Sequence, residues 1–144
     1  MAKSAKRVLL LNGPNLNLLG EREPEIYGTT TLADHVASAT QAATDAGLAV
    51  DSAQSNSSSE LVNAIHAART THDAIVINPG AFTHYAWSIH DALAAFSGPV
   101  IEVHISNVHA REAFRHQSFI APNAKGVIAG FGLKSYDLAI ESFL

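Results

Sequence analysis

The chain has 144 residues, 47% of them hydrophobic, and a formal net charge of −4, which together allow one sizeable core in a single domain over residues 1–144. Lys and Arg form no block outside a tail at residues 1–6 that we expect to be flexible, so neither nucleic acid nor a membrane surface is an expected partner. The absence of cysteine excludes a disulfide or thiolate site, and the apolar run at residues 8–11 is too short for a signal peptide or a membrane span, so we expect a cytoplasmic protein.

Short apolar segments alternate with amphipathic ones along the chain, which is typical of βα units around a parallel sheet. Several short segments are apolar at every position, as strands are when helices cover both faces of a sheet. The predicted strands are residues 7–11, 49–53, 74–77, 100–105 and 126–131.

The amphipathic segments predict four helices, two of which begin at recognisable caps. Thr31, with Asp34 three residues later, opens the first helix, which stops at Gly47, and a capping box of Ser57 and Glu60 opens the second. A fifth, shorter helix is predicted at residues 110–114. The apolar faces are Leu32, Val36, Ala39 and Ala43 in the first helix, Leu61, Ile65 and Ala68 in the second, Ile89, Leu93 and Phe96 in the third, and Leu138, Ala139 and Phe143 in the last of the four.

These elements predict an α/β fold of the flavodoxin-like kind, with a five-stranded parallel sheet and helices on both faces. In such folds ligands bind at the carboxyl ends of the strands, near the point where the strand order reverses. The long segment at residues 12–30 contains several Gly and Pro residues and no apolar period. Because so long a loop in a compact domain usually has a function, we expect an active-site lid at about residues 20–29.

Polar residues follow three of the predicted strands. Asn-Gly-Pro-Asn at 12–15 follows the first strand, Asn-Pro-Gly at 78–80 follows the third, and Glu-Val-His-Ile-Ser-Asn at 102–107 ends the fourth. Any one of these runs is readily explained as a turn, because Asn, Gly and Pro are ordinary turn residues. Their convergence on one edge of the sheet, together with the long loop, predicts a small-molecule site.

Glu102 and His104 are two residues apart on a predicted strand, so their side chains leave the same face and can form a hydrogen bond. A carboxylate next to an imidazole favours the protonated imidazole, which a general acid near neutral pH requires. A buried structural pair is the alternative, and the position at the carboxyl end of the strand favours chemistry.

The predicted lid contains Arg22 and Tyr27. A tyrosine phenol ordinarily has a pKa of ~10, too high for an efficient base at neutral pH, and a nearby guanidinium would stabilise the phenolate. Arg22 could provide that charge, as could Arg111 or Arg115 from the segment after the fourth strand. Considered by itself, a tyrosine before a glycine in a loop is more often a packing anchor.

His84 and Asp91 are seven residues apart on the predicted third helix, so they would share a face that points to a ligand, to another subunit or to solvent. No histidine spacing is typical of zinc, so no metal site is expected. Four other histidines are expected in solvated positions: His35, His66, His72 and His90.

Five blocks of residues together resemble the signature of type II 3-dehydroquinate dehydratases. The opening block is Leu-Asn-Gly-Pro-Asn-Leu-Asn-Leu-Leu-Gly at 11–20, followed by Arg-Glu-Pro at 22–24 and Tyr-Gly at 27–28. The pattern covers about residues 7–143 and is much more specific than any short motif. The other blocks are Gln-Ser-Asn-Ser at 54–57, Asn-Pro-Gly-Ala-Phe-Thr-His at 78–84, Glu-Val-His-Ile-Ser-Asn at 102–107 and Gly-Val-Ile-Ala-Gly-Phe-Gly at 126–132.

The resemblance implies a cofactor-free lyase that converts 3-dehydroquinate to 3-dehydroshikimate in the shikimate pathway of aromatic amino acid biosynthesis, as a dodecamer built from trimers. Tyr27 would be the base that removes a proton from the carbon beside the ketone, with Arg22 favouring its ionised form. Asn15 would help to position a water that holds the enolate. His104, oriented by Glu102, would protonate the departing hydroxyl.

The resemblance also implies substrate-binding residues, one of them supplied across a subunit contact in related enzymes, Asp91. The chain departs from the common family pattern at four positions, which bear on oligomer contacts and substrate affinity rather than on the implied catalytic groups. The implied binding residues within the subunit are Asn78, His84, Ile105, Ser106 and Arg115. The departures are Ser58, Ser59, Phe82 and His90.

Two other functions fit parts of the sequence. A flavodoxin-like electron carrier would bind flavin at the same edge of the sheet, but residues 12–17 contain one glycine and no Ser/Thr cluster to hold its phosphate. Dehydration through a lysine Schiff base would need a lysine in the site. The lysines, none of them inside a predicted strand, are Lys3, Lys6, Lys125 and Lys134.

Overall fold

The computed structural model describes residues 6–144, so that of the predicted flexible tail at residues 1–6 only Lys6 lies within the described residues. The strands form one sheet in the order β2-β1-β3-β4-β5, and every neighbouring pair is parallel. The order reverses between β1 and β3, and the predicted flavodoxin-like α/β fold is confirmed. The strands are β1 Arg7–Asn12, β2 Ala49–Gln54, β3 Ala74–Asn78, β4 Val100–His104 and β5 Gly126–Ala129.

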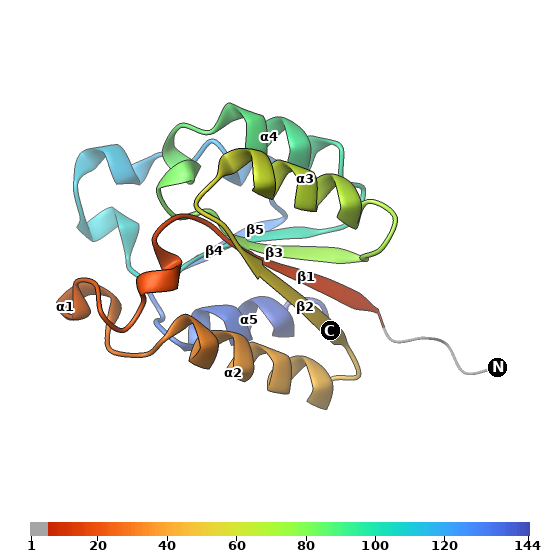
Figure 1. Cartoon of the computed structure of the whole chain (residues 1–144), viewed down its shortest axis with the longest axis horizontal. Helices are drawn as coiled ribbons and strands as arrows, with labels where there is room; N and C mark the ends of the chain where they lie inside the picture. Colours follow the sequence, from red (N-terminus) through yellow and green to blue (C-terminus); the bar gives the residue numbers. More distant parts are fainter. Residues whose placement is uncertain (1–5) are drawn as a thin grey trace.

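Helices cover both faces of the sheet, as Figure 1 shows. Helices α3 (Ser58–Ala68) and α4 (Trp87–Ala94) lie on one face, and α2 (Leu32–Asp45) and α5 (Lys134–Glu141) lie on the other. The short helix α1 (Pro24–Tyr27) lies at the end of the sheet opposite to the start of β1 (Figure 1). The four amphipathic helices that the sequence predicts are therefore all present.

The two predicted caps differ in how completely they form. At the start of α2 the capping box is complete: Asp34 N donates to the Thr31 hydroxyl at 3.2 Å, and Thr31 N donates to the Asp34 carboxylate at 3.0 Å. At the start of α3, Glu60 N donates to the Ser57 hydroxyl at 3.5 Å, but the Glu60 carboxylate accepts from the Ser55 hydroxyl instead of from Ser57 N. The second capping box is thus only half formed.

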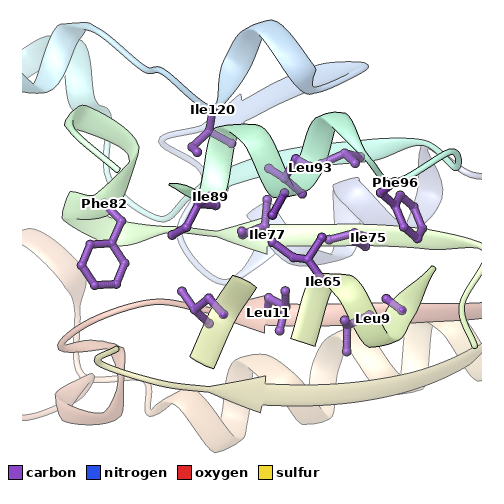
Figure 2. Packing of buried hydrophobic residues seen from close by; sticks show 14 of the residues in the cluster. Leu9, Leu11, Ile65, Ile75, Ile77, Phe82, Ile89, Leu93, Phe96 and Ile120 are labelled. Carbon is purple, nitrogen blue, oxygen red and sulfur yellow. The ribbon is translucent and has the colours of Figure 1, made fainter. Parts of the chain in front are cut away.

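One half of the hydrophobic core fills the space between the sheet and the helices α3 and α4 (Figure 2). Leu11 and Ile77 on β1 and β3 pack with Ile65 and Ile89 of those helices, and all four side chains are fully buried. Burial of a side chain of this size contributes about 1.5–3 kcal/mol. Leu10, the neighbour of Leu11, is buried on the opposite face with residues of α2 and α5. Burial on both faces explains why β1 and β3 are apolar at nearly every position.

The segment after β4 is not the single helix predicted at residues 110–114. Two 3-10 helices, η3 (Val108–Ala110) and η4 (Ala113–His116), flank Arg111, whose backbone is extended with φ −113° and ψ −163°. The Asn107 side chain caps η3. The extended residue interrupts the helical hydrogen bonds and projects its side chain towards the lid.

Other boundaries also differ from those predicted. β4 ends at His104 rather than at residue 105, and β5 ends at Ala129 rather than at residue 131, because Gly130 turns the chain with φ 94°. Residues 12–30 are not an irregular loop throughout, since they contain the 3-10 helix η1 (Leu16–Leu18) and the helix α1.

His35 is buried and not solvated as expected. Its residue is 1% exposed, it lies against the ring of Tyr136 with centroids 5.4 Å apart, and neither ring nitrogen has a hydrogen-bond partner among residues 6–144. Burial lowers the pKa of His35 below the ordinary 6.5, although the charges of Asp34 and Asp137 act in the opposite direction. The folded protein therefore favours the neutral imidazole.

This burial predicts a loss of stability in mild acid. The unfolded chain binds a proton on His35 more readily than the folded chain, so the free energy of unfolding falls as the pH drops below about 6.5, by at most about 1.4 kcal/mol per pH unit. Urea unfolding of His35→Leu between pH 5 and pH 8, at constant protein concentration, should show a smaller slope than the parent. The exposed His66, changed to Gln, serves as the matched control. Equal slopes in parent and His35→Leu would contradict the prediction.

Candidate active site

A cavity lies where the carboxyl ends of β1, β3 and β4 meet the segment at residues 12–30. It contains most of the predicted site residues: Asn15, Arg22, Tyr27, Asn78, His84, His104, Ile105, Ser106 and Arg115. Its remaining lining residues are Pro14, Leu16, Leu19, Gly80, Ala81, Val108 and Arg111. Glu102 lies directly behind His104. Asp91 does not line the cavity and is exposed on α4.

The turn that follows β1 is held by residues at and just after the end of β2. Gln54 donates from Nε2 to the carbonyl oxygen of Gly13 at 3.1 Å, and Asn15 N donates to the side-chain oxygen of Asn56 at 3.0 Å. Asn15 has a left-handed backbone conformation with φ 67°, which asparagine tolerates better than most residues. These contacts fix the backbone from which the Asn15 side chain leaves.

Tyr27 is the last residue of α1, and its hydroxyl meets a guanidinium. Arg111 donates from Nη1 to the Tyr27 hydroxyl at 2.6 Å. Arg22 instead lies over the Tyr27 ring, 5.4 Å from its centroid, and pairs with Glu23 at 3.1 Å. Of the three arginines that the sequence offers as partners of Tyr27, Arg111 makes the contact with the phenol oxygen in this structure.

Glu102 and His104 form the pair that the strand spacing predicts. Nε2 of His104 lies 3.2 Å from Oε1 of Glu102, and the two side chains are 8% and 1% exposed. Thr83 and Ser118 also donate hydrogen bonds to Oε1. Burial raises the pKa of the Glu102 carboxyl, but the hydrogen bond and charge of His104 and the two hydroxyl donors together outweigh it, so the pKa lies below its ordinary value. The site thus contains a buried carboxylate beside an imidazole.

Asn78 lines the cavity, but its amide takes part in a network below the cavity floor. Asn78 donates from Nδ2 to the Tyr136 hydroxyl at 3.0 Å, and Tyr136 donates to Oδ1 of Asn12 at 2.5 Å. The amide oxygen of Asn78 accepts from Gly80 N at 3.1 Å. Tyr136, which is fully buried on α5, therefore links the ends of β1 and β3.

His84 and Asp91 do not share a helix face. His84 is the last residue of the 3-10 helix η2 (Gly80–His84), and α4 begins only at Trp87, after a Tyr85 whose φ of −155° and ψ of −9° are not helical. His84 Nδ1 lies 2.7 Å from the carbonyl oxygen of Gln117, which orients the ring. Burial is the largest influence that lowers the pKa of His84 below 6.5. His84 is therefore placed in the cavity wall as a neutral hydrogen-bonding group.

Three guanidinium groups give the cavity a positive character: Arg22, Arg111 and Arg115 line it together. Arg115 is held by a 2.7 Å contact from its Nε to Glu112. Guanidinium groups bind carboxylates and phosphates through paired hydrogen bonds, so the cavity suits a small anionic ligand.

The described residues offer little support for other kinds of site. Among residues 6–144 there is no group of three or more His, Cys, Asp or Glu side chains that could hold a metal ion. Over the same range no helix is both long enough and apolar enough to cross a membrane. Of the lysines that the structure describes, none lines the cavity.

Several residues around the site have no distinct signal in the sequence. Thr83 and Ser118 lie 35 positions apart and are brought together at Glu102 by the fold, and Tyr136 is 124 positions from Asn12. Arg111 is one of three arginines that the sequence offers as partners of Tyr27, and only the tertiary structure distinguishes among them. Tyr136 lies four residues before Ile140 on α5, so its spacing alone predicts only a side chain that packs in the core.

Comparisons with known proteins agree with the geometry. Residues 6–144 match the family described as Dehydroquinase class II. A 3-dehydroquinate dehydratase from Actinobacillus pleuropneumoniae serotype 5b (strain L20) is 55% identical over 136 residues, which cover 94% of this chain and 88% of that protein.

Solved structures are similar over almost the whole chain. The crystal structure of type II dehydroquinase from Propionibacterium acnes superposes with a TM-score of 0.93 at 46% identity and covers 99% of this chain and 98% of that chain. The type II dehydroquinase structure from Butyrivibrio crossotus DSM 2876 gives a TM-score of 0.94 at 44% identity, with 97% and 98% covered.

The Tyr136 network predicts a clear cost for a single hydroxyl. Tyr136→Phe removes the hydroxyl that donates to Asn12 and accepts from Asn78. The Nδ2 atom of Asn12 already has no hydrogen-bond partner in the described part of the chain. We expect the free energy of unfolding to fall by about 1–3 kcal/mol, because buried polar groups lose their partner. Urea denaturation measures the change. Tyr85→Phe, at a residue that is 59% exposed, is the control. An unchanged stability in Tyr136→Phe would contradict the network's importance.

Proposed function

The chain belongs to the class II dehydroquinase family, and from that membership we propose how its own residues dehydrate 3-dehydroquinate to 3-dehydroshikimate. The enzyme is a type II 3-dehydroquinate dehydratase, a lyase. One observation carries the proposal: a tyrosine whose hydroxyl contacts a guanidinium and a histidine paired with a buried carboxylate line the same cavity. The tyrosine is the proposed base, the histidine is the proposed acid, and both line one cavity.

The substrate is bound through its charge and its hydroxyls. 3-Dehydroquinate carries a carboxylate, which suits a cavity with three guanidinium groups. Arg115, Ile105 and Ser106 are the proposed contacts of the carboxylate and nearby hydroxyls, together with His84. Asn78 contributes to the floor of the site, where its own amide is held by Tyr136.

Tyr27 acts first, as the base. Its phenolate takes a proton from the carbon beside the ketone, and the guanidinium of Arg111, 2.6 Å from the oxygen, stabilises the negative charge before transfer. Arg22, over the ring, adds a second positive charge nearby. The product of this step is an enolate, whose oxygen is stabilised by a water that Asn15 positions.

His104 acts second, as the acid. The enolate reforms the ketone, the new carbon–carbon double bond forms, and the carbon–oxygen bond of the departing hydroxyl breaks while the His104 imidazolium supplies a proton, so that water leaves. Nε2 faces Glu102 at 3.2 Å, which leaves Nδ1 for the substrate. Tyr27 then holds one proton more and His104 one fewer, and exchange with solvent restores both.

Further parts of the proposal concern the assembly and the setting of the enzyme. Asp91, exposed on α4, is proposed to reach the site of a neighbouring subunit in a dodecamer built from trimers. A cytoplasmic location and a role in aromatic amino acid biosynthesis through the shikimate pathway stay predictions. The flavin-carrier alternative is not favoured by the family membership, and the Schiff-base alternative finds no lysine among the described residues of the cavity wall.

The first test removes the acid and the base separately. We expect Tyr27→Phe and His104→Ala each to lower turnover by about 10²- to 10⁴-fold, because this is what a positioned proton-transfer group supplies. The appearance of conjugated-enone absorbance after addition of 3-dehydroquinate measures the rate, and circular dichroism verifies the fold. Near-normal turnover in either folded variant would refute its assigned role.

The second test separates the two arginines near Tyr27. Arg111→Gln should move the acidic limb of the turnover pH profile to higher pH by more than Arg22→Gln, because only Arg111 contacts the phenol oxygen. Both variants are compared with the parent over the same pH range. An equal or larger shift in Arg22→Gln would show that the lid arginine takes over this contact when substrate is bound.

A further inference from the structure

We infer that Thr83 and Ser118 are positioning residues that hold Glu102 as an oriented carboxylate and thereby keep His104 a proton donor. The inference rests on the proposed function, in which His104 is the acid. Neither residue lines the cavity, so neither hydroxyl is placed to contact the substrate directly.

All the hydrogen bonds of the Glu102 carboxylate converge on one oxygen. Oε1 accepts from the Thr83 hydroxyl, from the Ser118 hydroxyl at 2.7 Å and from His104 Nε2 at 3.2 Å. The other oxygen, Oε2, is buried and has no partner within residues 6–144. The residue as a whole is 0% exposed, so water does not replace any of these donors. The orientation of the carboxylate is therefore set by two hydroxyl groups and the imidazole.

The Ser118 hydroxyl is a hydrogen-bond donor in the cluster around Glu102. Its oxygen accepts from Ile120 N at 3.1 Å and from Ala121 N at 3.0 Å. A hydroxyl has one proton and two acceptor positions, so both acceptor positions are filled by the backbone. The proton is left to donate, and the acceptors within reach are Oε1 of Glu102 at 2.7 Å and the Thr83 hydroxyl oxygen at 2.6 Å. Thr83 Oγ1 lies 2.6 Å from Ser118 Oγ, and with those acceptor positions filled its proton is also directed at Glu102.

The two segments that carry these hydroxyls are also hydrogen-bonded to each other. The carbonyl oxygen of Thr83 accepts from Phe119 N at 2.7 Å, and the neighbouring His84 bonds to the carbonyl oxygen of Gln117 at 2.7 Å. Thr83 is 1% exposed. The segment 117–121 and the helix η2 thus form one clasp, which holds both the carboxylate behind His104 and a histidine of the cavity wall.

The clasp acts on the charge of the pair. Burial opposes the ionised form of Glu102, and hydrogen bonds to a carboxylate favour it. When a hydroxyl donor is lost, Glu102 takes up a proton more readily, and the His104 imidazolium loses part of its counter-charge. The protonated acid then persists over a narrower range of pH. A purely structural role for the hydroxyls would change stability without moving this range.

The test compares variants of the intact enzyme in which single hydroxyls are removed. Thr83→Val and Ser118→Ala should each lower kcat about tenfold with little change in KM, because a hydrogen bond to a charged group is lost while the cavity lining is kept. The alkaline limb of the kcat pH profile should move to lower pH. Thr83→Ser keeps a hydroxyl at this position, so its kcat should be close to that of the parent enzyme. Thr40→Val removes a part-buried threonine hydroxyl on α2 and is the matched control.

A second readout observes the imidazole directly. In protein with isotope-labelled histidine, the NMR titration of His104 should move to lower pH in Ser118→Ala and remain at the parental position in Thr40→Val. Ser118→Ala removes a single oxygen, so it decides the question if Thr83→Val fails to fold. An unmoved titration and an unmoved alkaline limb in folded Ser118→Ala would overturn the inference.

The same experiment distinguishes the inference from the function on which it rests. If His104→Ala loses turnover while Thr83→Val and Ser118→Ala behave like Thr40→Val, the positioning role fails and the acid assignment stands. If His104→Ala retains turnover, the acid assignment fails and the positioning role fails with it. Lower thermal stability with parental kcat and pH profile would assign the two hydroxyls to the fold alone and overturn the inference.

Discussion

The common direction of all five strands is the constraint on which the site depends. Because the strands are parallel, their carboxyl ends meet at one edge, and the register aligns Asn12 with both Gln54 and Asn78 there. A slip of one residue would turn these polar side chains into the core and apolar ones towards the cavity. The turns at this edge also pack closely: a Cβ on Gly13 would lie 2.4 Å from the carbonyl oxygen of Pro79, so only glycine fits. The site is thus a direct consequence of strand direction and register.

Two charged centres are built at that edge, and burial affects them differently. Tyr27 is partly exposed at the end of α1 and meets Arg111, a residue that comes from the extended break between η3 and η4. Glu102 is part of the sheet itself and is completely buried, so it needs several hydrogen-bond donors to remain a carboxylate. Tyr27 and His104 thus line one cavity from two different parts of the fold, the segment after β1 and the end of β4.

Much of the fold could be predicted because each element carries a local signal. The apolar strands, the cap at Thr31 and the two-residue spacing of Glu102 and His104 are all visible without tertiary information. His35 shows where residue type misleads: it lies four residues before Ala39 and eight before Ala43, on the buried face of α2, although histidine suggests solvent. The helical spacing predicts the burial of His35 better than the polarity of its side chain does.

The parts that could not be predicted depend on contacts between distant segments. The choice of Arg111 over Arg22 as partner of the Tyr27 hydroxyl depends on where the chain after β4 is extended, and the 110–114 segment has helical composition throughout. Likewise, Ser118 is an ordinary loop serine until the fold brings it to Glu102. The prediction that His84 shares the helix of Asp91 is wrong, because the non-helical Tyr85 that separates η2 from α4 has no sequence signal of its own.

The central claim is that Tyr27 and His104 act in sequence through an enolate, and hydrogen exchange tests it most directly. His104→Ala is incubated with 3-dehydroquinate in deuterated water, and proton NMR follows the carbon beside the ketone. We expect deuterium to enter that position without formation of product, because the base still works when the acid is missing, and we expect no such exchange in Tyr27→Phe. Exchange that persists in Tyr27→Phe, or that is absent in folded His104→Ala, would contradict the account.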